Sequence, residues 1–204
     1  MSMRKATPNS ALATPHLQVR HTALSLFAEQ GFQNVSLRKL ASALGMQAGS
    51  IYNHIESKQD LLFELIDEYE ADLLDALEVS VLSNTKPFEQ LLAYIRTHIN
   101  FNVEHTHRRS IAQLEFRNLS PSQKMVILAI RKKQANTLSS IVQLVIQKNA
   151  FNPIRFKATE SLLIAMLNET AHMISADNNI APDDTIISLH KIITALLHTD
   201  SEKT

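Results

Sequence analysis

The side chains best suited to contacting another molecule lie between positions 36 and 58. Small or polar side chains occupy Gln47 to Ser50 in succession, and hydrogen-bond donors follow at Tyr52 and His54. Short side chains let a helix backbone approach the floor of the DNA major groove, where hydrogen-bonding groups distinguish base edges. The hydroxyl and basic side chains nearby are suited to binding the phosphate groups of the DNA backbone. We therefore predict that DNA is contacted by Ser36, Arg38, Gln47, Ala48, Gly49, Ser50, Tyr52, His54 and Lys58.

Two short helices joined by a glycine turn would position these side chains. Ser36 is suited to cap the first helix, Gly45 ends it, and the second runs over about residues 47–55. A preceding helix over about residues 16–30, capped by Gly31, completes a three-helix unit.

Each of these side chains also has a structural interpretation. Tyr52 could be a half-buried core tyrosine, His54 only a helix cap, and Gln47 and Ser50 an ordinary solvated helix start. The basic residues around them favour DNA contact.

The use of glycine indicates an all-α fold. Only three glycines occur, all in the first quarter of the chain, so a glycine-rich phosphate loop is absent. Apolar residues recur every three or four positions, with no sustained alternation and no Asn-Gly or Asp-Gly hairpin turn. Beyond the first three helices we expect others at about 57–81, 86–104, 107–118, 121–150, 156–177 and 182–199, which gives about nine in all.

Charge divides the chain although its net charge is zero. We predict a flexible arm over residues 1–15, a helix-turn-helix head over 16–59, and a ligand-binding and dimerisation body over 60–204. Residues 1–59 hold six basic and two acidic side chains, a net charge of +4, and the remainder carries −4. A basic head suits phosphate contact, and we expect the acidic run of the fourth helix to face solvent.

The segment TALSLFAEQGFQNVSLRKLASALGMQAGSIYNHIESKQDLL resembles the DNA-binding region of the TetR (tetracycline-repressor) family of transcription regulators, over about residues 16–65. Ile55 departs from the family pattern, in which Phe is common. The resemblance implies a three-helix DNA-binding head and a helical ligand-binding and dimerisation body. It assigns DNA contact to the same nine positions. It also implies that the last two helices pack against their copies in a homodimer, which would bind a palindromic operator.

The effector is suggested by a weaker likeness. LEFRNLSPSQKMVILAIRKKQANTLSSIV and the AMLNETAHMI helix are similar to the bodies of fatty-acid or acyl-CoA responsive members of the family. A cavity between these helices would be largely aliphatic, with polar anchors. We predict its lining to include Leu114, Phe116, Arg117, Met125, Leu128, Met166, Asn168 and His172. The apolar stripe would serve equally as plain core, and the polar residues could satisfy one another.

Other function classes are disfavoured. The chain has no cysteine, no helical His pair of the zinc-binding kind and no Gly-x-Ser-x-Gly elbow, so we expect no metal, no cofactor, no catalytic residue and no enzyme activity. No apolar run is long enough to export the chain or to span a membrane, which favours the cytoplasm.

The leading hypothesis is a homodimeric, ligand-responsive repressor released from its operator by a small apolar or acyl-type effector, such as a fatty acid or acyl-CoA. The alternative is a DNA-tethered protein-interaction factor whose body binds no small molecule.

Overall fold

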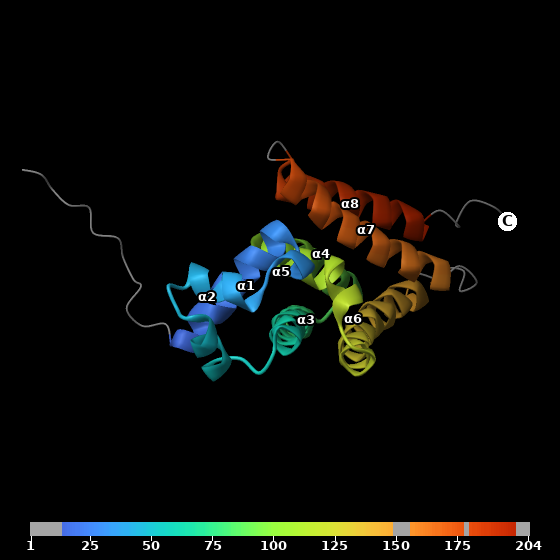
Figure 1. Cartoon of the computed structure of the whole chain (residues 1–204). Coiled ribbons are helices and arrows are strands. Elements are labelled where there is room, and N and C mark those ends of the chain that lie inside the picture. The colour runs from blue at the N-terminus through green and yellow to red at the C-terminus, as the bar shows by residue number, and fades with distance from the viewer. Residues whose placement is uncertain (1–13, 149–155, 178–179, 199–204) are drawn as a thin grey trace, which may run out of the picture.

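The computed structural model describes residues 14–148, 156–177 and 180–198, and within those ranges every regular element is helical. The α-helices are α1 (Pro15–Gln30), α2 (Leu37–Ala43), α3 (Lys58–Leu82), α4 (Pro87–Glu104), α5 (Thr106–Leu114), α6 (Pro121–Lys148), α7 (Phe156–Ala176) and α8 (Pro182–His198) (Figure 1). Three short 3₁₀ helices join them: η1 (Phe32–Asn34), η2 (Ala48–Asn53) and η3 (Phe116–Asn118). The predicted all-α fold is confirmed. Most of the predicted arm lies outside the described residues.

The first two helices of the head begin and end close to the residues that the sequence indicated. The Oγ of Ser36 accepts a hydrogen bond from the amide of Lys39 at 3.1 Å, as an N-cap does. Gly31 ends α1 with φ of +79°, and Gly45 follows α2 with φ of +67°. A residue with a Cβ is strained at such φ values, so glycine is required at these two positions.

The third predicted helix is a 3₁₀ helix and not an α-helix. It covers only Ala48–Asn53, between an extended Gln47 and the turn at His54. Short helical pieces often take the tighter 3₁₀ form, and Gly49 adds little helix propensity to so short a segment. Ile51 is buried within it, so the segment is anchored on one side while its other side faces outward.

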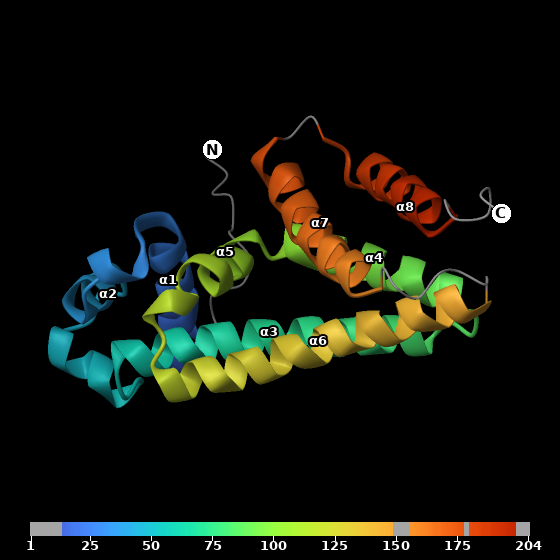
Figure 2. The ribbon, with the colours of Figure 1, turned by 90° about the vertical axis from the view of Figure 1, so that its right-hand side faces the viewer.

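The body is built in layers that extend away from the head. Figure 2 shows α3 and α6 lying side by side along the length of the molecule. In both ribbon views α4 lies between α3 and the pair formed by α7 and α8, and α6 also contacts α7. Helix α3 begins in the head, where Ser57 caps it by accepting from the amide of Asp60 at 3.0 Å. It then continues through the body.

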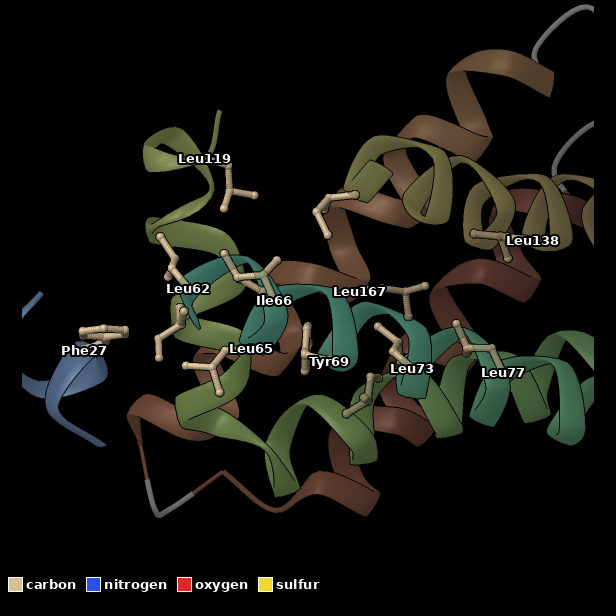
Figure 3. Packing of buried hydrophobic residues seen from close by; sticks show 14 of the residues in the cluster. Phe27, Leu62, Leu65, Ile66, Tyr69, Leu73, Leu77, Leu119, Leu138 and Leu167 are labelled. Atoms are coloured by element: carbon tan, nitrogen blue, oxygen red, sulfur yellow. The ribbon is translucent and has the colours of Figure 1, made fainter. Parts of the chain in front are cut away.

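One continuous hydrophobic core joins the head to the body. Figure 3 shows the buried residues Leu62, Leu65, Ile66, Tyr69, Leu73 and Leu77 following one another along α3. Phe27 of α1 belongs to the same cluster, as do Leu138 of α6 and Leu167 of α7. The three- to four-residue spacing on α3 places one apolar face toward its neighbours. Helix α3 is therefore the helix against which α1, α4, α5 and α6 pack.

Candidate functional site

The outward side of η2 is open and polar. Gln47, Ala48 and Gly49 are exposed, and the side chain of Tyr52 is 62% exposed. A Cβ placed on Gly49 would meet no atom within 4 Å, so packing inside the protein does not require glycine there. Ser50 and His54 are half-buried at the edges of this surface. Tyr52 is thus not the core tyrosine that was considered as an alternative.

Residues from α2, η2 and α3 meet in a shallow hollow beside this surface. Its lining combines Ser36 and Arg38 with Tyr52 and Lys58, together with Leu37. Ser36 and Arg38 are exposed at the start of α2. The structure thus brings a hydroxyl, a guanidinium, a phenol and an ammonium together on the face that carries η2, a donor set suited to phosphate oxygens.

Much of the hydrogen-bonding capacity of Lys58 is used inside the head. Its Nζ donates to the carbonyls of Phe32 and Val35, both at 2.9 Å, and lies 4.1 Å from the centroid of the Phe32 ring. Burial lowers the pKa of Lys58, and the negative charge of Glu115 acts in the opposite direction. The residue holds the loop after α1 against the start of α3, a role that the sequence analysis missed.

Arg20 is a second head cation that the structure shows to be neutralised. Its guanidinium forms ion pairs with Glu64 and Glu68 of α3. Glu64 and Glu68 are exposed, as expected for the acidic run of α3, and through Arg20 they also fasten α1 to the body. Asp72 does the same for α5, through an ion pair of 2.6 Å with Arg108.

The head is also hydrogen-bonded to the corner between α5 and η3. The buried Glu115 accepts from the amide of Phe32 at 3.0 Å. Gln33 donates to the side chain of Asn118 at 2.8 Å, and Gln59 donates to its carbonyl at 2.9 Å. A displacement of α5 would therefore be transmitted to the loop that begins the helix-turn-helix.

The body contains a partly open central cavity of about 180 Å³ whose wall is more polar than the sequence predicted. Residues of α3, α4, α5, α6 and α7 contribute to it. The hydroxyl of Tyr69 donates to Asn102 at 2.6 Å, and Asn102 donates to the backbone carbonyl of His98 at 2.7 Å. Burial lowers the pKa of His98 to about 4, so the imidazole is neutral at physiological pH. Burial likewise raises the pKa of Tyr94, whose hydroxyl donates to the carbonyl of Gln134.

An ion pair between the buried Glu70 and the partly exposed Arg131 lies in the same wall. Arg131 of α6 donates from Nε to Glu70 at 2.7 Å and from Nη2 to the carbonyl of Ala112 at 2.7 Å. Gln134 donates to the other carboxylate oxygen of Glu70 at 3.1 Å. The expectation that this acidic residue faces solvent is wrong for Glu70, because it points toward α6 and is matched there by a cation.

Most of the predicted ligand-binding residues do not line the central cavity. Asn168 lines it, whereas Leu114 and His172 line a second hollow between α5 and α7. Met125 and Leu128 are 73% and 52% exposed, because α6 turns Ile127 and Leu138 toward the core instead.

The other predicted lining residues lie elsewhere. Phe116 lies beneath the guanidinium of Arg131, Met166 packs against the core, and Arg117 is exposed.

The residues that do line the cavity left a detectable signal in the sequence. Tyr94, His98 and Asn102 recur every four residues on α4, which places three polar groups on one helix face. Such a stripe on an otherwise apolar helix indicates a polar core network. The ion pair of Glu70 with Arg131 has no such signal in the sequence, because the two residues lie 61 positions apart and no local pattern links them.

In the described residues no group of His, Cys, Asp and Glu side chains is arranged to hold a metal ion. No described helix is both long and apolar enough to cross a lipid bilayer.

The exposed η2 surface, the basic hollow beside it and a cavity-bearing helical body define a helix-turn-helix regulator of transcription. Two family models match the chain: "Bacterial regulatory proteins, tetR family" over residues 19–65, and "Tetracyclin repressor-like, C-terminal domain" over residues 84–193. The chain therefore belongs to the TetR family, whose members regulate transcription by binding DNA.

Individual relatives are distant in sequence. The "Fatty acid metabolism regulator protein" of Bacillus subtilis (strain 168) is 22% identical over 156 residues, covering 76% of this chain and 80% of the relative. The "HTH-type transcriptional repressor KstR2" of Mycolicibacterium smegmatis is 24% identical over 133 residues, 64% of each chain.

Among solved structures, AibR in complex with isovaleryl coenzyme A and operator DNA superposes with a TM-score of 0.78 at 19% identity, covering 87% of this chain and 97% of AibR. At this identity the similarity establishes the shared fold.

Proposed function

We propose that this protein is a homodimeric repressor that binds a palindromic operator through its heads and leaves it when a small acyl-type effector occupies the body. The single observation that carries the proposal is the exposed η2 surface on a head that is hydrogen-bonded to α5. Helix α5 contributes Ala112 and Gln113 to the cavity wall, while Glu115 at its end holds Phe32 of the head. One helix thus lines the cavity and is hydrogen-bonded at its end to the head that carries the η2 surface.

The DNA contacts would divide into two kinds. Gln47, Ala48, Gly49 and Ser50 form the end of η2 that would approach base edges, where small side chains permit close contact. The residues of the neighbouring hollow would bind phosphates, with Arg38 contributing an exposed charge. His54 would contribute a donor at the edge of this surface.

A dimer is supported by apolar residues left exposed on the last two helices. Leu162 and Met173 of α7, and Ile187 and Ile192 of α8, are each about half exposed or more. The opposite faces of these helices are already used, because α7 and α8 both pack on α4. Large apolar side chains on two adjacent helices are typical of an interface, and a two-fold pair would place two heads for two half-sites.

The cavity bears on the size of the effector. Its volume of about 180 Å³ is below the roughly 300–1,000 Å³ of typical small-molecule pockets, so in this conformation it fits a short acyl group. A longer chain would have to enlarge the cavity by displacing helices from its wall. An effector that binds such an enlarged state more tightly would shift the protein away from the DNA-binding arrangement. The coenzyme A thioester bound by AibR supports an acyl-type effector.

DNA binding is tested by a gel shift on the region upstream of the protein's own gene, against random duplex DNA of the same length. We expect Tyr52→Ala and Arg38→Ala to weaken binding about tenfold or more while leaving the fold intact, because both side chains are exposed. Matched controls on the body are Val79→Ala and Lys132→Ala, which remove an exposed apolar and an exposed basic side chain. Equal affinity for both DNAs would contradict the proposal.

Effector binding is tested by adding short- and long-chain acyl-CoAs and the corresponding acids to the protein–operator complex. The expected result is release from DNA together with a rise in melting temperature, since a ligand that binds only the folded protein stabilises it. Operator binding that no acyl compound changes, with no rise in melting temperature, would favour a DNA-tethered interaction factor.

A further inference from the structure

Arg109 of α5 is a buried cation with two guanidinium nitrogens that have no hydrogen-bond partner among the described residues. The residue is 4% exposed, and neither its Nε nor its Nη1 donates a hydrogen bond within the described part of the chain. No described carboxylate lies within ion-pair distance of it. Tyr69 and Glu169 favour its charged form from a greater distance, against the effect of burial.

Other charged groups in the same region are paired. Arg108, the preceding residue, reaches Asp72, and Arg131 is matched by Glu70. The buried Glu115 accepts from the amide of Phe32. Burying a charge without a partner is costly, and buried polar groups are normally hydrogen-bonded. Within the described residues, Arg109 is therefore an exception to this pairing.

A hollow of about 260 Å³ between α5 and α7 is the place where a partner from outside the chain would bind. Arg109 lines it together with Thr106, Ser110 and Gln113 of α5 and with Ser175 of α7. The hydroxyls of Thr106 and Ser175 already donate to the carbonyls of Val103 and Ala171. The donors left for a ligand are Arg109 and the side chains of Ser110 and Gln113, which form no hydrogen bond in the described residues.

We propose that Arg109 binds the anionic group of the effector, a carboxylate or a phosphate. A guanidinium matches the paired oxygens of either group, and its charge would no longer be uncompensated. Gln113 lines both this hollow and the central cavity, so the two are neighbours, and the proposal directs the apolar part of a ligand held by Arg109 toward the cavity. Arg131 is less suited to the anion because Glu70 already neutralises it. The inference rests on the proposed function in that the bound anion is the effector.

The test compares three probes that share an eight-carbon chain: octanoate, octyl phosphate and octanol. Binding to the full-length protein is measured by calorimetry and by melting temperature, without DNA, in a chloride-free buffer of fixed ionic strength. The variants are Arg109→Met and Arg109→Gln, and Arg96→Met removes an exposed arginine of α4 as the control.

We expect one or both anions to bind the wild type and the Arg96 variant more tightly than octanol does. In both Arg109 variants the anions should bind about ten- to a hundredfold more weakly, at the level of octanol. Without ligand, Arg109→Met should melt at or above the wild-type temperature, because it removes an unpaired buried charge. The tighter of the two anions identifies carboxylate or phosphate as the recognised group.

The inference is overturned if the Arg109 variants keep the wild-type preference for anions over octanol, or if no anion binds the wild type. It is also overturned if unliganded Arg109→Met melts well below the wild type, since that result assigns Arg109 a structural partner. These failures are separate from failure of the proposed function. Release of the operator by a neutral acyl compound would keep that function without the anion site. An anion that binds through Arg109 without affecting operator binding would keep the site without that function.

Discussion

Acidification should destabilise the protein through His98, which is buried among Tyr94, Asn102 and the other side chains of the central cavity. Burial lowers the pKa of His98 from 6.5 to about 4 in the folded protein. In the unfolded chain the imidazole is hydrated and takes up a proton near pH 6.5. Between these two values the unfolded state binds one more proton than the folded state. The free energy of unfolding must therefore fall as the pH is lowered from about 6.5 toward 4, and the contribution is constant outside that window.

The size of the effect follows from the separation of the two pKa values. A shift from 6.5 to about 4 corresponds to about 3 kcal/mol over the whole window, of which about 2 kcal/mol is lost between pH 7 and pH 4.5. Other titrating groups also change the stability of the wild type over this range. Comparison with His98→Gln removes their effect, because the variant keeps a polar side chain of similar reach but does not titrate.

The assay is urea unfolding at pH 7.0, 6.0, 5.0 and 4.5, at one protein concentration because a dimer's stability depends on concentration. The wild type should lose about 2 kcal/mol more than His98→Gln between the first and last pH. His107→Gln removes an exposed histidine of α5 and is the control. Parallel pH profiles for wild type and His98→Gln would refute the reasoning, since they would mean that His98 titrates alike in both states.

Three further predictions concern other features of the head and body. Gly31→Ala should cost about 1–2 kcal/mol in urea unfolding because φ at Gly31 is +79°, whereas Gly49→Ala should leave stability unchanged because its Cβ would meet open space. Equal effects of the two alanines would contradict the backbone argument. Arg131→Met should cost about 3–5 kcal/mol by leaving the Glu70 carboxylate buried without its cation, and adding Glu70→Gln should restore part of that loss in the same measurement. An unchanged Arg131→Met variant would show that Glu70 is not charged in the folded protein. Arg20→Ala should leave the salt dependence of operator affinity nearly unchanged, because two carboxylates of α3 neutralise this cation. If the slope of log affinity against log salt concentration became shallower by about 2 per dimer, Arg20 would instead contact a phosphate in each head.

The local features of the fold were predictable because they depend on neighbouring residues. Ser36 and Ser57 cap the helices that follow them, since a hydroxyl three residues before a free amide can accept from it. Gly31 and Gly45 end helices because they alone adopt a positive φ without strain. The form of η2 was not predictable in the same way, because a segment of six residues is short enough to adopt either 3₁₀ or α-helical geometry.

The cavity could not be derived from the sequence because it depends on how helices are rotated about their axes. Helix α6 carries apolar residues on more than one face, and periodicity alone could not decide between the face of Met125 and Leu128 and the face of Ile127 and Leu138. The choice is made by packing against α3 and α4. Selection of the second face also turns Arg131 toward Glu70, and this contact supplies the ion pair of the cavity wall.

The basic charge of the head is a second feature that the sequence predicts only in part. The excess of basic residues correctly distinguishes the end that carries the helix-turn-helix, but charge alone does not say which cations are available to DNA. Arg20 is neutralised by two carboxylates of α3, and Lys58 donates two hydrogen bonds to backbone carbonyls. Arg38 and Lys39 remain exposed at the start of α2. Exposure and pairing, and not the number of basic residues, therefore decide the electrostatic part of DNA affinity.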